Sequence, residues 1–386
     1  MASTFSAHAG PSSLPSSALN PRRHVNVHAE HVSDVSNTEY PGHYPGEDHS
    51  WNLAKFEKSL RVEVQRLSQR SIEFDLVGVD ASIANAFRRI MIAEVPTMAI
   101  ERVYVYNNTS VIHDEVLAHR LGLVPLDVNP RLFEFVHEDK EGKLTDRNTL
   151  VFSLDVTCEA DKSGPREKGA PRRYINEYVT SGDLIFRPAG EQVSVLSEGS
   201  ANYSPGPTNK NIVLAKLRPG QQIEMELHAV KGVGKEHAKW SPVATASYRL
   251  HPLILLNPSK PVPPHLAEKF ARCFSPGVVQ IGSNGEVSID QRAMRKESMS
   301  REVFRHKEFE GCVQLKRIRD WFIYTVESEG PHPPQELLPE AIQVMRSKIA
   351  DIRRAAEALL AGADGEQEGA GQGQGDGDGD VSMRDA

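Results

Sequence analysis

Residues 74 to 100 read Phe74-Asp-Leu-Val-Gly-Val-Asp-Ala-Ser-Ile-Ala-Asn-Ala-Phe-Arg-Arg-Ile-Met-Ile-Ala-Glu-Val-Pro-Thr-Met-Ala-Ile100, a pattern of strand, turn, helix and strand. Apolar residues recur in it with helical spacing, at Ile83, Phe87, Ile90 and Met91. A helix over Ser82–Glu94 would therefore have one apolar face. Asp80 or Ser82 can cap its start, and Pro96 would end it.

The last stretch with strong periodicity lies near the C-terminus. Its apolar residues are spaced 4, 3, 4, 3, 4 and 3 apart, at Leu338, Ile342, Met345, Ile349, Ile352, Ala356 and Leu359. We call these seven residues the seam, because this spacing is the a/d pattern of helices that pair with other helices. The seam predicts contact with a helix of another chain; the alternative is a helix that lies on its own sheet. Pro339 places the start of the helix close to that residue.

The composition is typical of a soluble globular protein. The 386 residues leave room for two domains, with 39% hydrophobic and 25% charged residues. No stretch approaches the ~20 apolar residues of a membrane span, and the N-terminus lacks the apolar segment of a secretory signal. The three cysteines, Cys158, Cys273 and Cys312, form no CxxC pair, so neither a disulfide framework nor a zinc ribbon is indicated.

The net charge of −7 comes almost wholly from the C-terminal end, where residues 361–386 hold seven acidic residues and one arginine. The rest of the chain is nearly neutral, which argues against a dominant nucleic-acid surface, because such affinity comes largely from neutralising phosphates. We expect residues 361–386 to be a disordered acidic, Gly-rich tail, and residues 1–52 to be disordered because they hold few aliphatic side chains. The Gly-Asp repeat at 375–380 lacks the glutamate and flanking helices of a calcium loop.

Between these ends the sequence predicts mainly strands with a few helices. The expected strands are Thr149–Val156, Ile223–Val230, Thr245–Leu250 and Gly277–Ile281. The expected helices are His113–Leu121, closed by Gly122, then His265–Arg272, and a basic helical stretch, Arg292–His306. The expected loops are 162–173, 190–211 and the proline-rich connector Pro252–Pro264.

The run from 74 to 100 resembles the signature of the alpha-type subunits of cellular RNA polymerases. The segments Glu101–Leu126, Leu217–Leu250 and Arg319–Gly330 resemble the same family, so the similarity covers roughly residues 53 to 360. It is greatest to the larger alpha-like subunit type shared by eukaryotic RNA polymerases I and III. The third subunit of RNA polymerase II is a nearer relative than the bacterial alpha subunit.

The resemblance implies an α+β fold with a discontinuous dimerisation domain. That domain would comprise residues 53–100, 217–251 and 316–360, the last part carrying the C-terminal helix. A mostly β inserted domain would occupy residues 101–216. A small ferredoxin-like insertion without metal ligands would occupy residues 252–315.

The implied function is that of a non-catalytic assembly platform. The chain would form a heterodimer with a smaller alpha-like subunit and then dock the largest and second-largest subunits of polymerases I and III, with small auxiliary subunits. The protein would be located in the nucleus, including the nucleolus. It would take part in the transcription of rRNA, 5S rRNA and tRNA. It would meet nucleic acid only through the complex, and no membrane.

The resemblance also implies roles for the helix over Ser82–Glu94. Apolar residues of its inner face, Ile83, Phe87 and Ile90, would bury against the sheet and the partner's helix. Arg88 and Arg89 would make ionic contacts with the partner or with a large subunit; the alternative is that both arginines are solvated. With the seam, these residues form the expected partner interface.

No residue set points to catalysis, a cofactor or a metal. The histidines at 113 and 119 are six apart, which is the wrong spacing for a helical zinc pair, and Gly232-Val-Gly-Lys235 lacks the spacing of a phosphate loop. Some archaeal relatives hold an iron–sulfur cluster, and the third subunit of polymerase II holds zinc, but Cys273 lacks the further ligands that either needs. That absence argues against the polymerase II type. A homodimeric polymerase, or an enzyme with an unrecognised site, stays an alternative.

Overall fold

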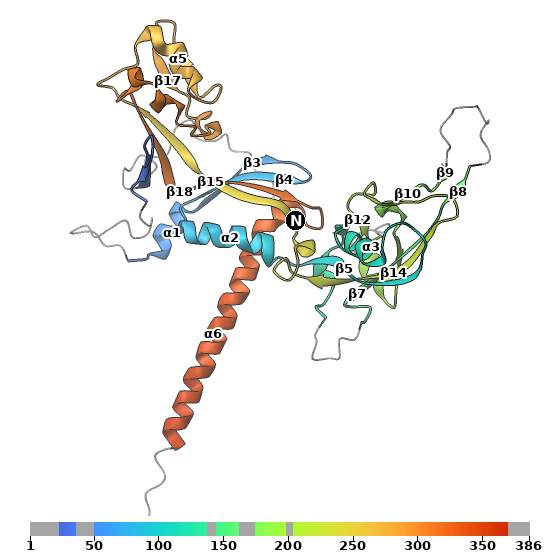
Figure 1. Cartoon of the computed structure of the whole chain (residues 1–386). Coiled ribbons are helices and arrows are strands. Elements are labelled where there is room, and N and C mark those ends of the chain that lie inside the picture. The colour runs from blue at the N-terminus through green and yellow to red at the C-terminus, as the bar shows by residue number, and fades with distance from the viewer. Residues whose placement is uncertain (1–22, 36–49, 137–143, 162–173, 198–203, 370–386) are drawn as a thin grey trace, which may run out of the picture.

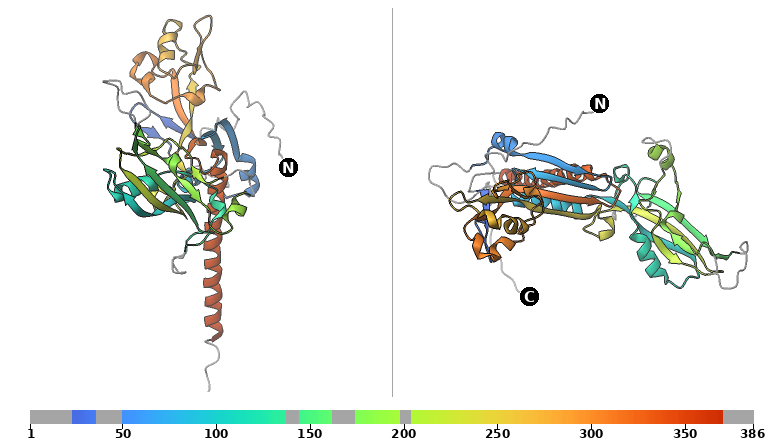
Figure 2. Two further views of the ribbon diagram at one scale, coloured as in Figure 1. Left: turned by 90° about the vertical axis from the view of Figure 1, so that its right-hand side faces the viewer. Right: turned by 90° about the horizontal axis from the view of Figure 1, so that it is seen from above.

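The computed structural model describes residues 23–35, 50–136, 144–161, 174–197 and 204–369. These residues form two large antiparallel sheets, several two-stranded ones, a small compact insertion on the first large sheet and one long C-terminal helix (Figure 1). Seen from above, the second sheet lies beyond one end of the first (Figure 2).

The first sheet, called the main sheet, has the order β2-β1-β18-β4-β3, with β15 on the other side of β18. Its strands are β1 His24–Val27, β2 Val32–Ser33, β3 Arg61–Leu67, β4 Ser71–Val77, β15 Val243–Leu256 and β18 Val313–Ser328. Its helices are α1 Leu53–Ser59, α2 Ala81–Ala93 and α6 Leu337–Gly369, preceded by a 3-10 turn, η11 Pro334–Glu336. One face of the sheet packs against α2 and the first turns of α6, and the other face packs against the insertion.

The second sheet has the order β11-β7-β14-β5. Its strands are β5 Thr97–Asn108, β7 Thr149–Thr157, β11 Ile185–Arg187 and β14 Gln222–Gly232, and helix α3 Asp114–Gly122 packs beside β5. Shorter elements complete this half: β6 Leu126–Asp127, β8 Glu159–Ala160, β9 Tyr174–Ile175, β10 Tyr178–Thr180, α4 Gln192–Ser197, β12 Gly206–Pro207 and β13 Val213–Lys216. Alternate residues of β7 and β14 fill its apolar core, as expected for strands with one buried face.

The insertion, residues 257–312, joins the ends of β15 and β18. It holds α5 Ala267–Arg272, the hairpin β16 Val279–Ile281 with β17 Val287–Ile289, and 3-10 turns that include η8 Met294–Lys296 and η9 Glu302–Arg305. Three aromatic rings, Phe270, Phe274 and Phe309, pack together at its centre.

Most elements expected from periodicity are present. Helix α2 begins one residue before the expected Ser82 and ends at Ala93, with Asp80 as its cap. The strands expected at 149–156 and 223–230 are β7 and β14, and the one at 245–250 lies within β15. Helix α3 is also confirmed, but Gly122 is its last residue rather than a left-handed cap, because Leu123 follows in right-handed helical conformation.

Several expectations are wrong. Residues 23–35 lie in the N-terminal segment that we expected to be disordered, yet they form the β1–β2 hairpin on the edge of β18, with Val25 and Val27 buried. Residues 1–22 and 36–49 lie outside the described residues. The acidic tail was expected from residue 361, but α6 continues to Gly369, and residues 370–386 are likewise outside the described part.

The connector expected at Pro252–Pro264 begins as strand, since β15 runs to Leu256. Pro252 is tolerated because β15, among the described strands, pairs with β18 alone and so lies at the edge of the sheet; a register shift also precedes it at Leu250/His251. The basic helical stretch at 292–306 is not an α-helix. Met299 and Arg301 have φ values of 60° and 61°, which interrupt a right-handed helix and leave only short 3-10 turns.

Two further segments differ from expectation. The expected loop at 190–211 contains α4 and β12, while the loop at 162–173 lies outside the described residues. Residues 217–251 were expected to belong together with the main sheet, but β14 pairs with β5 and β7 in the second sheet. Only β15, the later part of that segment, lies in the main sheet, because the chain crosses between the sheets at 233–242.

Candidate partner interface

Helix α2 is held on the main sheet by its inner face. The Oδ1 atom of Asp80 accepts a hydrogen bond from the backbone N–H of Ser82 at 2.8 Å, which caps the helix. Ala84, Ile90 and Met91 are buried in the core beneath. The hydroxyl of Tyr324 donates to the carbonyl oxygen of Ala84, and burial raises the pKa of this phenol. The helix is therefore fixed in position without any partner.

The outer side of α2 carries the other residues expected at an interface. Ile83 and Phe87 pack against the edge of the same core but remain partly exposed. The guanidinium group of Arg88 donates from Nε and Nη2 to Oδ1 of Asn85, at 3.1 and 2.9 Å, whereas Arg89 is exposed. Ile90 lies in the core of this chain, so it supports the surface from below.

The first turns of α6 pack on α2 and the main sheet. Leu337 and Ala341 are completely buried there, and Val344 packs beside them. The Nζ atom of Lys348 lies 2.9 Å from Oε2 of Glu94, the residue that follows the end of α2 as its C-cap. The sequence analysis missed Leu337 and Ala341, although their spacing of four residues was the available signal.

The seam divides into a covered and an uncovered part. Leu338 and Met345 are partly buried against the α2 core. The exposed fraction then rises from 39% at Ile342 to 56% at Ile349, 71% at Ile352 and 76% at Leu359, and Ala356 is exposed as well. Beyond Met345 the helix projects away from both sheets, and no described part of the chain covers it (Figures 1 and 2).

This projection argues against the alternative that the seam lies on its own sheet. A helix lying on its own sheet would bury these side chains, whereas only its first turns do so here. From residue 346 to Gly369 the helix extends about 35 Å, at about 1.5 Å per residue. Its uncovered part keeps the a/d pattern through Leu359. An apolar stripe on a projecting helix has no stabilising contact with the described part of the chain, so it is a candidate surface for a second helix.

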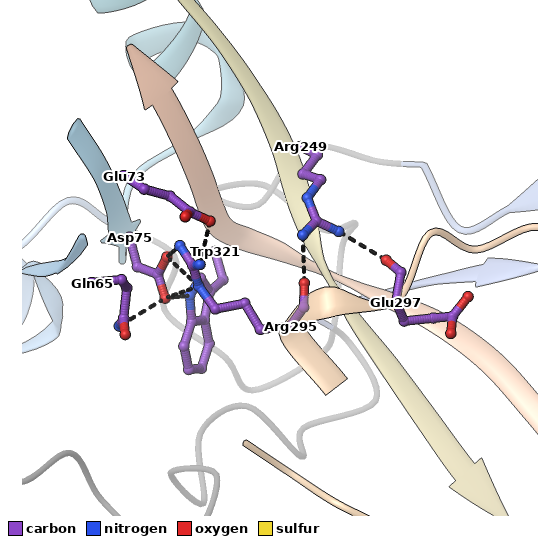
Figure 3. Close-up of polar contacts among 7 residues, drawn as sticks. All are labelled: Gln65, Glu73, Asp75, Arg249, Arg295, Glu297 and Trp321. Atoms are coloured by element: carbon purple, nitrogen blue, oxygen red, sulfur yellow. Dashed lines mark hydrogen bonds and ion pairs between the residues drawn. The ribbon is translucent and has the colours of Figure 1, made fainter. Parts of the chain in front are cut away.

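A buried polar network fixes the insertion on the opposite face of the main sheet (Figure 3). Arg295 of η8 donates from Nη2 to Oδ1 of Asp75 at 2.6 Å and pairs with Glu73 through Nη1. The indole N–H of Trp321 donates to Oδ2 of Asp75 at 3.2 Å, and Arg249 donates to the carbonyl oxygen of Glu297 at 2.8 Å. Burial acts to lower the pKa of Arg295, but its hydrogen bonds to Asp75 and Glu73 raise it overall.

An open cavity of about 560 Å³ lies where the two sheets meet, between α3, β5 and the loop before β15. Its lysine is already engaged: Nζ of Lys239 donates to the carbonyl oxygen of Ile100 at 2.9 Å and pairs with Glu101. Within the described ranges, no group of three or more His, Cys, Asp or Glu side chains could hold a metal ion. Nor is any described helix both long and apolar enough to cross a membrane.

The chain is similar to a known family and to several curated proteins. Residues 73–349 match the family described as the RNA polymerase Rpb3/Rpb11 dimerisation domain. The chain is 46% identical over 319 residues to the DNA-directed RNA polymerases I and III subunit RPAC1 of Bos taurus, covering 82% of this chain and 90% of the relative. It is 42% identical to the subunit of the same name in Saccharomyces cerevisiae, covering 84% and 96%.

A relative from RNA polymerase II is more distant. The DNA-directed RNA polymerase II subunit rpb3 of Dictyostelium discoideum is 33% identical over 81% of this chain and 100% of its own length. The match spans well over half of the chain, and its matched residues include α2, β18 and the uncovered helix up to Ile349. The chain therefore belongs to the family of alpha-like RNA polymerase subunits with the Rpb3/Rpb11 dimerisation domain.

Proposed function

We propose that this chain pairs with a smaller alpha-like subunit through the seam of α6 and the outer side of α2. The observation that carries the proposal is the exposure of the later seam residues, Ile349, Ile352 and Leu359, which keep core-like spacing while nothing in the described chain covers them. Two such helices brought together would bury Ile349, Ile352 and Leu359 from both sides. Ile83 and Phe87 would extend the contact onto α2, and Arg89 would lie at its rim.

The chain is a non-catalytic polymerase subunit of the type shared by RNA polymerases I and III. Its identity to relatives with that name is 38–46%, against 33% for the polymerase II subunit, at similar coverage. The polymerase II type is therefore the second candidate. As a subunit of nuclear polymerases the chain acts in the nucleus. We infer that a fraction of the protein molecules works in the nucleolus, where rRNA is made.

The heterodimer would act as a platform for the two large subunits and for small auxiliary subunits. A preformed surface lowers the ordering entropy that each later subunit loses on binding. In this proposal the second sheet acts as the inserted domain of the family, and the insertion at 257–312 corresponds to its ferredoxin-like module, packed by side chains without metal. The network around Asp75 supports the packing of the insertion by side chains, because its hydrogen bonds hold the insertion to the main sheet.

The test is affinity purification of the tagged chain from its own cells at moderate salt, with mass spectrometry of the recovered proteins. We expect the large subunits of polymerases I and III and a smaller alpha-like chain at one-to-one stoichiometry. Recovery of polymerase II subunits alone would move the chain to the second candidate. A lone, monodisperse protein would contradict the platform function altogether.

A further inference from the structure

The layer of helices on the main sheet ends one strand before the edge of that sheet. Strand β4 is covered, with Ile72, Phe74 and Leu76 buried in the core that α2 and α6 share. Strand β3 pairs with β4 and, among the described strands, is the last on this side. The face of β3 that continues this core therefore has no helix of the described chain packed on it.

Three aliphatic residues of β3 lie on that face. The ladder places Val62 opposite Leu76, Val64 opposite Phe74 and Leu67 opposite Ile72. Directly opposite residues of an antiparallel pair point to the same side of a sheet. Val62, Val64 and Leu67, which we call the β3 stripe, thus point to the side of α2 and α6. Their exposed fractions are 51%, 57% and 53%.

A register shift between Val64 and Arg66 is what keeps the stripe on one face. With strict alternation Arg66 would follow Val64 on the helix side, and Leu67 would point away. The bulge reverses this order, so that Arg66 lies opposite Glu73 and Leu67 joins the two valines. The break in the ladder thus places a third aliphatic side chain on a face that the described residues leave exposed.

We propose that a helix of the smaller alpha-like subunit covers the β3 stripe. This inference rests on the proposed function, since it assigns a further contact to the same partner. The stripe is continuous with the face that α2 and α6 define, and elsewhere on that face the covering layer is helical. The exposed apolar surface comes from side chains rather than from the strand edge, so it fits the aliphatic side of a helix. Strand β3 lies before residue 73, outside the matched dimerisation family.

The test uses the heterodimer made by co-expression of this chain with the smaller alpha-like subunit. Val64→Glu, alone and with Val62→Glu, places a carboxylate in the proposed contact, and we expect the dissociation constant to rise about tenfold or more for each. Val111→Glu is the matched control, because Val111 is 84% exposed and follows β5 in the other half of the molecule. Val64→Ala, a milder change, should weaken binding two- to threefold, by a rough area estimate, with folding intact.

Ile352→Asp in the seam separates this inference from the proposed function. If Ile352→Asp breaks the heterodimer while the β3 variants bind like Val111→Glu, the β3 contact is wrong and the seam stands. If Ile352→Asp also binds normally, the proposed pairing itself is wrong.

A photo-crosslinking residue at position 64 in the intact polymerase gives a second, independent measurement of what contacts the β3 stripe. An adduct with the alpha-like partner supports the proposal. An adduct with another subunit, with a second copy of this chain, or with a strand paired to the edge of β3 would overturn it.

Discussion

The guanidinium group of Arg295 donates a 2.6 Å hydrogen bond to the carboxylate of Asp75, a residue 220 positions earlier in the chain. The side chain of Asp75 is 2% exposed, and it also accepts from the indole of Trp321 at 3.2 Å. Both charges are therefore paired and hydrogen-bonded at the boundary between the main sheet and the insertion. This pair couples two parts of the molecule that are joined covalently only through β15 and β18.

Breaking this pair should be costly. Asp75→Ala would leave Arg295 with one carboxylate fewer in a partly buried position, and we expect a loss of about 3 kcal/mol of unfolding free energy. Arg295→Met should cost a similar amount, since it leaves Asp75 buried without its cation. The double variant Asp75→Leu with Arg295→Met should recover part of the loss. Urea unfolding of all three measures this, and single variants within about 0.5 kcal/mol of wild type would contradict the buried-pair interpretation.

The seam should tolerate a charge in the free chain but not in the heterodimer. Ile352→Asp changes a side chain that is 71% exposed here, so we expect the unfolding midpoint of the chain to stay nearly constant. In the heterodimer the carboxylate would be buried, and the dissociation constant should rise at least about a hundredfold. Analytical ultracentrifugation of the co-expressed pair checks this. Ser347→Asp, which the heptad spacing places opposite the seam, is the control and should leave pairing unchanged.

His251 should make stability depend on pH. The ring of His251 is buried and lies 4.3 Å from the ring of Trp321. Desolvation by burial lowers the pKa of this histidine from 6.5 to about 4, because the opposing effect of the Asp75 charge, which raises the pKa, is smaller. The folded state binds the proton on His251 more weakly than the unfolded state does. Above pH 6.5 the ring is neutral in both states, so it does not lower the free energy of unfolding there. Between pH 6.5 and 4 the unfolding free energy should fall by up to about 1.4 kcal/mol per pH unit.

The pH effect can be isolated with His251→Gln. Urea unfolding at pH 7, 6 and 5 should show a smaller loss of stability toward acid in this variant than in the wild-type chain. Equal slopes for the two proteins would mean that His251 is not the group responsible.

Two glycines allow backbone strain to be separated from steric overlap. Gly78 and Gly220 have nearly equal φ values of +88° and +87°. A Cβ at Gly78 would lie 2.4 Å from the carbonyl oxygen of Ser59, at the end of α1, whereas a Cβ at Gly220 would meet nothing within 4 Å. Gly220→Ala should therefore cost about 1 kcal/mol, from the left-handed backbone alone. Gly78→Ala should cost at least about 1 kcal/mol more, because α1 must move; equal thermal shifts would contradict this.

Local sequence patterns were enough to find the regular helices and strands but not which elements lie next to one another. Helix α2 and strands β7 and β14 follow from apolar spacing, since each presents one regular face to a core. The β1–β2 hairpin could not be found in this way. Its buried residues, Val25 and Val27, are too few to show a period, and the hairpin exists because β18 offers it an edge at Leu315–Ile318.

The candidate interface shows the same division. The sequence by itself determined the seam, because the a/d spacing is a property of one helix and needs no neighbour. Only the tertiary structure decided which part of the seam is covered, since this depends on where α6 leaves the main sheet. The pairing of Asp75 with Arg295 and the open β3 stripe likewise depend on residues that folding brings together. Local periodicity carries no information on contacts across 220 residues, so these features had to come from the packed fold.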